Sequence, residues 1–195
     1  MKTGAVLLAG CLMAANAGAA TIHFTGNIEY HNDVVYTYFT LDNDADDVRI
    51  WTDSYQGGTN FDPITALWNA DGSLIDENDD NSGINPSTQT SYDSGFSLSS
   101  LAAGNYIFTI ATYNNAAQGN MLSDGFAYDG LDPIPLAEWD QPASHEGMGP
   151  NWSLWLDGVD SASNPDDAAS VPEPSSVALL GLGLLGLGLR RARRG

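Results

Sequence analysis

The most regular feature of the chain is an alternation of apolar and polar positions with a period of two. Residues 105–113 show it best, because Tyr106, Phe108 and Ile110 share one face of an extended chain. The same period recurs over residues 22–30, 34–41, 48–53 and 152–157. Such alternation predicts β-strands rather than helices.

The middle of the chain, residues 61–113, predicts antiparallel strands joined by turns. Residues 61–68 are mostly apolar, and Asp71 and Gly72 supply a tight reversal before a short return strand at 73–76. Residues 77–86 contain Ile84 as their one aliphatic side chain, too little to pack as a strand, so we expect a loop there. We therefore predict a single all-β, antiparallel domain over residues 21–160, followed by a flexible linker at 161–170 that has no apolar content.

The charge of the predicted mature segment is strongly negative. Residues 21–170 hold 24 Asp and Glu and one basic residue, Arg49, which gives a net charge of −23. Such a surface repels nucleic acid and anionic membranes, and it attracts divalent cations or basic partners. Solubility alone is the alternative explanation.

The N-terminus has the composition of an export signal. Residues 1–20 combine one positive charge, an apolar stretch and small residues before the expected cut at Ala19 or Ala20, which predicts a signal peptide removed by signal peptidase. The segment ending at Cys11 resembles a lipoprotein processing box, so lipoprotein processing is the alternative. With the ordinary cut the exported protein has no cysteine and no disulfide.

Residues 171–195 contain a Pro-Glu-Pro sequence, an apolar run at 177–189 and a basic end. As a helix, this run spans ~20 Å, less than the ~30 Å hydrocarbon core of a bilayer. The basic end is expected to stay cytoplasmic, which leaves the body in the periplasm. The basic tail consists of Arg190, Arg191, Arg193 and Arg194.

This C-terminal segment resembles a PEP-CTERM sorting signal, with Pro172, Glu173 and Pro174 as the motif. The resemblance implies a short hydrophobic helix that holds the protein transiently in the inner membrane of a Gram-negative-type cell. It also implies recognition and removal by an exosortase, followed by a place at the cell surface or outside the cell. A permanent C-terminal anchor is the alternative.

The body also carries a resemblance, in Phe61-Asp-Pro63, Leu67 to Gly72, Asn78 to Asp80 and Leu101 to Tyr106. These segments resemble the bacterial pre-peptidase C-terminal (PPC) type of domain. The resemblance implies a jelly-roll-like β-sandwich that serves as an accessory module, and calcium binding in some members.

The loop after the predicted return strand is rich in oxygen donors, which suit calcium better than magnesium. The candidate calcium ligands are Asp71, Asp76, Asn78, Asp79, Asp80 and Asn81. A mobile, solvated loop is the alternative. The acidic stretch at 42–53 has partial EF-hand spacing, but Asp47 stands where that loop needs Gly and no flanking helices are visible, so we reject it.

The sequence contains no nucleophile elbow, metalloprotease motif or phosphate loop, so we expect no enzyme. A glycoside-acting enzyme with a hidden carboxylate pair is a further alternative. Trp51 and Trp155 lie on the parity opposite the aliphatic residues of their strands, where they either bind sugar rings of an exopolysaccharide or cover the other sheet face. The sequence thus predicts an exported structural or adhesive protein of the cell envelope or extracellular matrix, bound to anionic exopolysaccharide through calcium.

Overall fold

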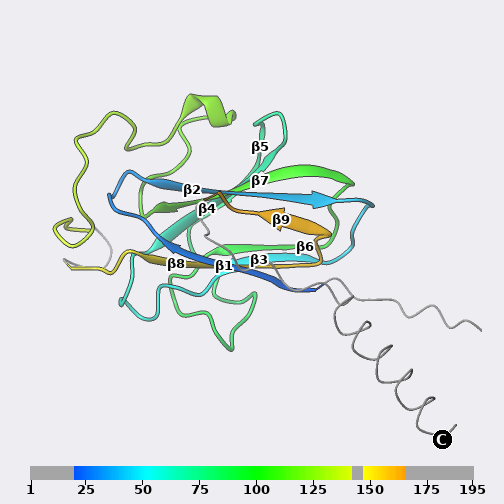
Figure 1. Ribbon diagram of the computed structural model, residues 1–195, viewed down its shortest axis with the longest axis horizontal. Helices are drawn as coiled ribbons and strands as arrows, with labels where there is room; N and C mark the ends of the chain where they lie inside the picture. Colours follow the sequence, from blue (N-terminus) through cyan, green and yellow to red (C-terminus); the bar gives the residue numbers. More distant parts are fainter. Residues whose placement is uncertain (1–19, 142–146, 166–195) are drawn as a thin grey trace, which may run out of the picture.

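The computed structural model describes residues 20–141 and 147–165, and their strands form two antiparallel sheets packed face to face (Figure 1). The first sheet has the order β1-β8-β3-β6, with bounds Ile22–Asn27, Asn151–Asp157, Val48–Thr52 and Gly95–Leu98. The second has the order β5-β4-β7-β2-β9, with bounds Leu74–Asn78, Pro63–Asn69, Gly104–Thr112, Val34–Leu41 and Ser161–Ser163. The prediction of an all-β antiparallel sandwich is confirmed.

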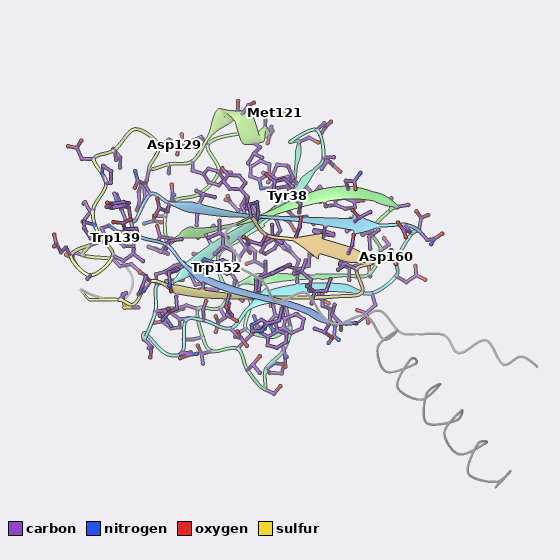
Figure 2. The ribbon with its side chains drawn as sticks, viewed as in Figure 1. Tyr38, Met121, Asp129, Trp139, Trp152 and Asp160 are labelled. Atoms are coloured by element: carbon purple, nitrogen blue, oxygen red, sulfur yellow. The ribbon has the colours of Figure 1, made fainter. Side chains whose placement is uncertain are left out.

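The main core lies between the sheets and is filled by every second side chain of their strands. In β8, Trp152, Leu154 and Leu156 are at most 1 % exposed, whereas the residues between them are only partly covered. Trp152 lies between the two layers (Figure 2), where the core also contains Phe108 and Ile110 of β7. Burying each such side chain contributes about 2 kcal/mol, which is why the period of two predicts these strands well.

A second, smaller core covers the outer face of the five-stranded sheet. Trp68 of β4 is fully buried there, and its indole Nε1 donates to Thr109 Oγ1 at 3.1 Å. The ring of Phe126 packs edge-on against it at 6.2 Å. Phe126 belongs to the segment 114–130, which passes over this face (Figure 1) and contains a single turn of 3-10 helix, η1 (Leu122–Asp124). Strand β4 is therefore buried on both faces, which accounts for its continuous apolar sequence.

Two predicted boundaries are wrong for the same reason. β5 extends through Glu77 and Asn78, which we expected in a loop, and β9 occupies Ser161–Ser163, where we expected the linker to begin. Both strands lie at an edge of the five-stranded sheet, where pairing through backbone hydrogen bonds needs no apolar side chain. The end of β9 is held by Asn164, which is buried and donates to Thr37 Oγ1 at 2.8 Å.

Nearly all of the predicted signal peptide, half of the predicted linker and the whole predicted sorting segment with its hydrophobic helix lie outside the described residues. This holds for residues 1–19 and for residues 166–195. Within residues 20–141 and 147–165, no helix is long and apolar enough to cross a membrane.

Candidate functional site

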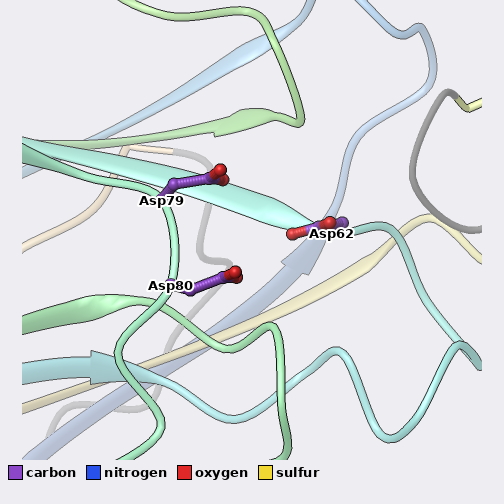
Figure 3. A group of neighbouring side chains, drawn as sticks. All are labelled: Asp62, Asp79 and Asp80. Atoms are coloured by element: carbon purple, nitrogen blue, oxygen red, sulfur yellow. The ribbon is translucent and has the colours of Figure 1, made fainter.

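Three aspartates from two separate segments lie together at one end of the sandwich. Asp62 immediately precedes β4, and Asp79 and Asp80 immediately follow β5. Their carboxylate oxygens lie within 4.8 Å of one another, and the three side chains are drawn in Figure 3. Asp62 is 2 % exposed, whereas Asp79 and Asp80 are exposed, so one side of the cluster is buried and the other is open to solvent.

The pairing of β4 with β5 explains why these residues meet. The two strands are antiparallel neighbours, and Thr65 stands opposite Asn78. In this register, the residues just before β4 lie beside those just after β5. Asp62 is therefore brought next to Asp79 and Asp80, although 17 positions separate it from the first of them.

The acidic loop is held in place by amide side chains on either side of its two aspartates. The Nδ2 groups of Asn78 and Asn81 donate to the backbone oxygen of Gly95, at 3.1 and 3.4 Å. Gly95 has φ of 142°, and a Cβ at this position would lie 2.2 Å from the backbone oxygen of Ile50. Only glycine fits here, so β6 can pass close to β3 while its carbonyl anchors the loop.

The cluster is electrostatically unfavourable without a cation. Burial raises the pKa of the Asp62 carboxyl to about 8, and repulsion by Asp79 and Asp80 adds to the effect. Burial also raises the pKa of Asp79, with a further contribution from Asp80, and burial raises the pKa of Asp80. Among the described residues Asp62 Oδ1 has no hydrogen-bond partner, although it is buried. A buried carboxylate without donors is costly, and a bound cation would remove the cost.

The structure brings together only part of the predicted ligand set. Asp79 and Asp80 lie in the cluster, but Asp71 instead accepts hydrogen bonds from Ser73 in the β4–β5 turn. Asp76 is exposed on β5 opposite Leu67. Asn78 and Asn81 use their Nδ2 groups to bond Gly95, which leaves their Oδ1 atoms as the potential ligands, so their part in the ligand set stays a prediction. Asp62 lies in the cluster but was not among the predicted ligands, although its motif Phe61-Asp-Pro63 is visible in the sequence.

Of the two alternatives for Trp51, an exposed sugar-binding ring does not agree with the structure, because its side chain is only 4 % exposed. Trp51, Trp155 and His23 are direct cross-strand neighbours on the outer face of the four-stranded sheet. The Trp155 ring stacks on His23 at 3.7 Å and lies parallel to Trp51 at 6.1 Å. Because these rings stack on one another, Trp51 offers no open face to a sugar ring. The alternative, that the tryptophans cover the other sheet face, agrees with this packing.

A family model for the PEP-CTERM protein-sorting motif matches residues 170–194. The chain carries a PEP-CTERM sorting motif. It includes the predicted Pro172, Glu173 and Pro174 and the basic tail, and it implies export, membrane-anchored sorting through the envelope and processing by exosortase. This part of the sequence prediction is confirmed.

The match covers the sorting segment and not the sandwich, so the resemblance of the body to the PPC type of domain stays a prediction. The cleaved signal peptide and the final location also stay predictions. A search of curated proteins finds no match to the chain.

Proposed function

We propose that this exosortase-sorted β-sandwich is a non-catalytic, calcium-binding structural or adhesive protein of the cell envelope or extracellular matrix. The observation that carries the proposal is the buried Asp62 carboxylate, which has an unpartnered Oδ1 and lies within 4.8 Å of two further carboxylates. A cation between the three would neutralise their repulsion and satisfy the buried oxygen.

The donor set favours calcium among the divalent cations. Three carboxylates offer up to six oxygens, and calcium accepts six to eight in irregular geometry, whereas magnesium demands near-ideal octahedral ligation. No imidazole or thiolate is part of the described cluster, which argues against zinc. Outside the cytosol, modules that bind calcium with dissociation constants of ~0.1–1 mM are functional, so a partly open site suffices.

The open side of the cluster supports a bridging role. Asp79 and Asp80 are exposed, so a calcium ion held by them and Asp62 would keep coordination positions toward solvent. A carboxylate of an anionic polysaccharide is a suitable ligand for those positions. Without the ion, a body with a net charge of −23 over residues 21–170 would repel the same polymer. Calcium would thus convert repulsion into adhesion.

The first experiment compares thermal unfolding of the full chain in excess calcium and in chelator. Calcium should raise the Tm. At a calcium concentration one hundred times the dissociation constant, binding should stabilise the folded state by ~2.7 kcal/mol. Asp80→Asn should reduce this response strongly, whereas the matched control Asp71→Asn should keep it. Equal Tm values in calcium and in chelator would remove the proposal, and so would equal responses of the two variants.

A second experiment tests the bridging role separately. We expect the wild-type protein to bind immobilised hyaluronan, a carboxylated polysaccharide, in calcium and not in chelator. Asp80→Asn should lose this binding, and magnesium should not replace calcium. Calcium-dependent melting without polysaccharide retention would leave a calcium-stabilised structural protein and exclude the adhesive role.

A further inference from the structure

A groove of about 790 Å³ lies on the opposite side of the sandwich from the second core, over the four-stranded sheet. Strand β1 contributes Thr25 and Asn27 to it, and β8 contributes Asn151 and Ser153. The remaining wall comes mainly from residues 53–60, the loop that follows β3. Its volume lies within the range of ~300–1,000 Å³ that is typical of small-ligand sites.

The groove differs in chemistry from the rest of this acidic body. Its lining side chains are almost all hydroxyls and amides, with Asp53 as the only charged residue among them. The Asp53 carboxylate is already engaged, since it accepts hydrogen bonds from Ser153 Oγ and, at 2.9 Å, from Trp155 Nε1. Neutral groups that both donate and accept hydrogen bonds suit a polyhydroxylated ligand, and the absence of Lys and Arg from this lining disfavours an anion.

Two buried polar atoms of the lining lack partners. Ser54 Oγ and Trp152 Nε1 have no hydrogen-bond partner among the described residues, and both residues border the groove. Gly26 lies against this indole, where a Cβ would come within 2.9 Å of Nε1. Glycine at this position therefore leaves room for the Trp152 ring in the core. Both atoms have less than 1 Å² of exposed surface, so the lining groups that a ligand can reach are the exposed amides of Asn27 and Gln56.

The walls are fixed in advance by hydrogen bonds. Ser153 Oγ lies 2.9 Å from His23 Nε2, so one hydroxyl joins the stacked His23–Trp155 pair to Asp53. On the loop, Asn60 Oδ1 accepts from both the backbone and the side chain of Asn151. Gln56, at the rim, has a left-handed backbone with φ of 49°, a conformation that non-glycine residues seldom adopt outside specialised sites. A prearranged polar groove binds with little ordering cost.

We infer that this groove binds a segment of a neutral glycan, whose hydroxyls bond to the exposed side chains of Asn27, Gln56 and Thr59. The site is independent of the aspartate cluster and requires no calcium. It lies beside the stacked Trp51–Trp155 pair and uses amides and hydroxyls in place of their ring faces.

The test is affinity electrophoresis of the full chain through gels containing dextran, galactomannan or hydroxyethylcellulose. At least one of these neutral polymers should retard the wild-type protein in the presence of chelator. The double variant Asn27→Ala/Gln56→Ala should lose about tenfold in affinity. Both residues are exposed, so the variant should keep its Tm.

The matched control is Asn120→Ala/Gln118→Ala, which removes the same side-chain types from the exposed segment over the other sheet. It should bind as the wild type does. Retardation by none of the three polymers overturns the inference, as does equal retardation of the two double variants. Retardation by an anionic polymer that depends on calcium, without any by the neutral polymers, also overturns it while leaving the proposed function intact.

Discussion

Asp62 and Asp93 are both buried aspartates, but they differ in the hydrogen bonds that the protein supplies to their carboxylates. Asp93 is fully buried and accepts four hydrogen bonds, from Tyr55 N, Thr52 Oγ1 and both the backbone and hydroxyl of Thr90. Asp62 is nearly as buried, has an unpartnered Oδ1 and faces Asp79 and Asp80. Burial raises the pKa of both, but the hydrogen bonds of Asp93 oppose the rise.

The contrast separates a structural carboxylate, Asp93, from the proposed metal ligand, Asp62. The protein supplies every partner that Asp93 needs, so that its charge ties residues 52–55 to residues 90–93. At Asp62 the partner must come from outside, as a proton below its pKa of about 8 or as a cation. Four variants or conditions test this distinction.

The largest effect is expected from Asp93→Ala. It would leave the donors of Tyr55, Thr52 and Thr90 without their acceptor and should cost about 3 kcal/mol, because buried donors would remain unsatisfied. The Tm should fall by ~10 °C. The rise of Tm on adding calcium should nevertheless persist in thermal scans. A loss of the calcium response would mean that Asp93 belongs to the metal site.

Asp62→Asn should act in the opposite direction. In chelator at pH 8 we expect a gain of ~1–2 kcal/mol, since an amide replaces an unsatisfied buried carboxylate. Calcium should no longer raise the Tm of this variant. Urea unfolding in calcium and in chelator measures both effects. A variant less stable than the wild type in chelator would show that Asp62 has a protein partner.

The pH dependence follows from the raised pKa of Asp62. Its folded value of about 8 lies above the unfolded value of ~3.9, so between them the folded state holds the extra proton. The calcium-free protein should therefore lose stability from this group as pH rises from ~4 to ~8. In chelator, the Tm difference between Asp62→Asn and the wild type should widen over this interval. A constant difference would contradict the raised pKa.

The smallest effect is expected from Asp71→Asn. Asp71 is an exposed turn residue whose pKa is lowered by hydrogen bonds from Ser73. The Tm should stay within ~2 °C of the wild type, with the calcium response unchanged. Thermal scans in calcium and in chelator measure both, and a lost response would extend the site to this turn.

The fold was predictable where burial imposes a pattern. The strand Val34–Leu41 is obtained from alternation to the residue, because one of its faces lies in the core. Strand β9 was not predictable, because Ser161–Ser163 pair with β2 through their backbones and carry no apolar signal. For Trp51 the sequence left exposure and burial as alternatives, since parity gives the face of a sheet and not what packs on that face.

The candidate metal site was only half predictable. Asp79 and Asp80 stand out in an acidic loop, whereas Asp71 and Asp76 stand out equally and lie elsewhere. The pairing of β4 with β5 decides which acidic side chains lie together. The sequence predicts the turn between these two strands. Extending that hairpin by its antiparallel register would have placed Asp62 beside the loop. The hydrogen bonds that Asn78 and Asn81 donate to Gly95 could be known only from the three-dimensional structure.

The most direct test of the calcium site is isothermal titration of calcium into the purified full chain at pH 7.5. We predict one ion per chain for the wild type and for Asp71→Asn, with no binding isotherm for Asp62→Asn or Asp80→Asn. Absence of binding to the wild type, or an unchanged isotherm in Asp62→Asn, would contradict the assignment of a calcium site to Asp62, Asp79 and Asp80.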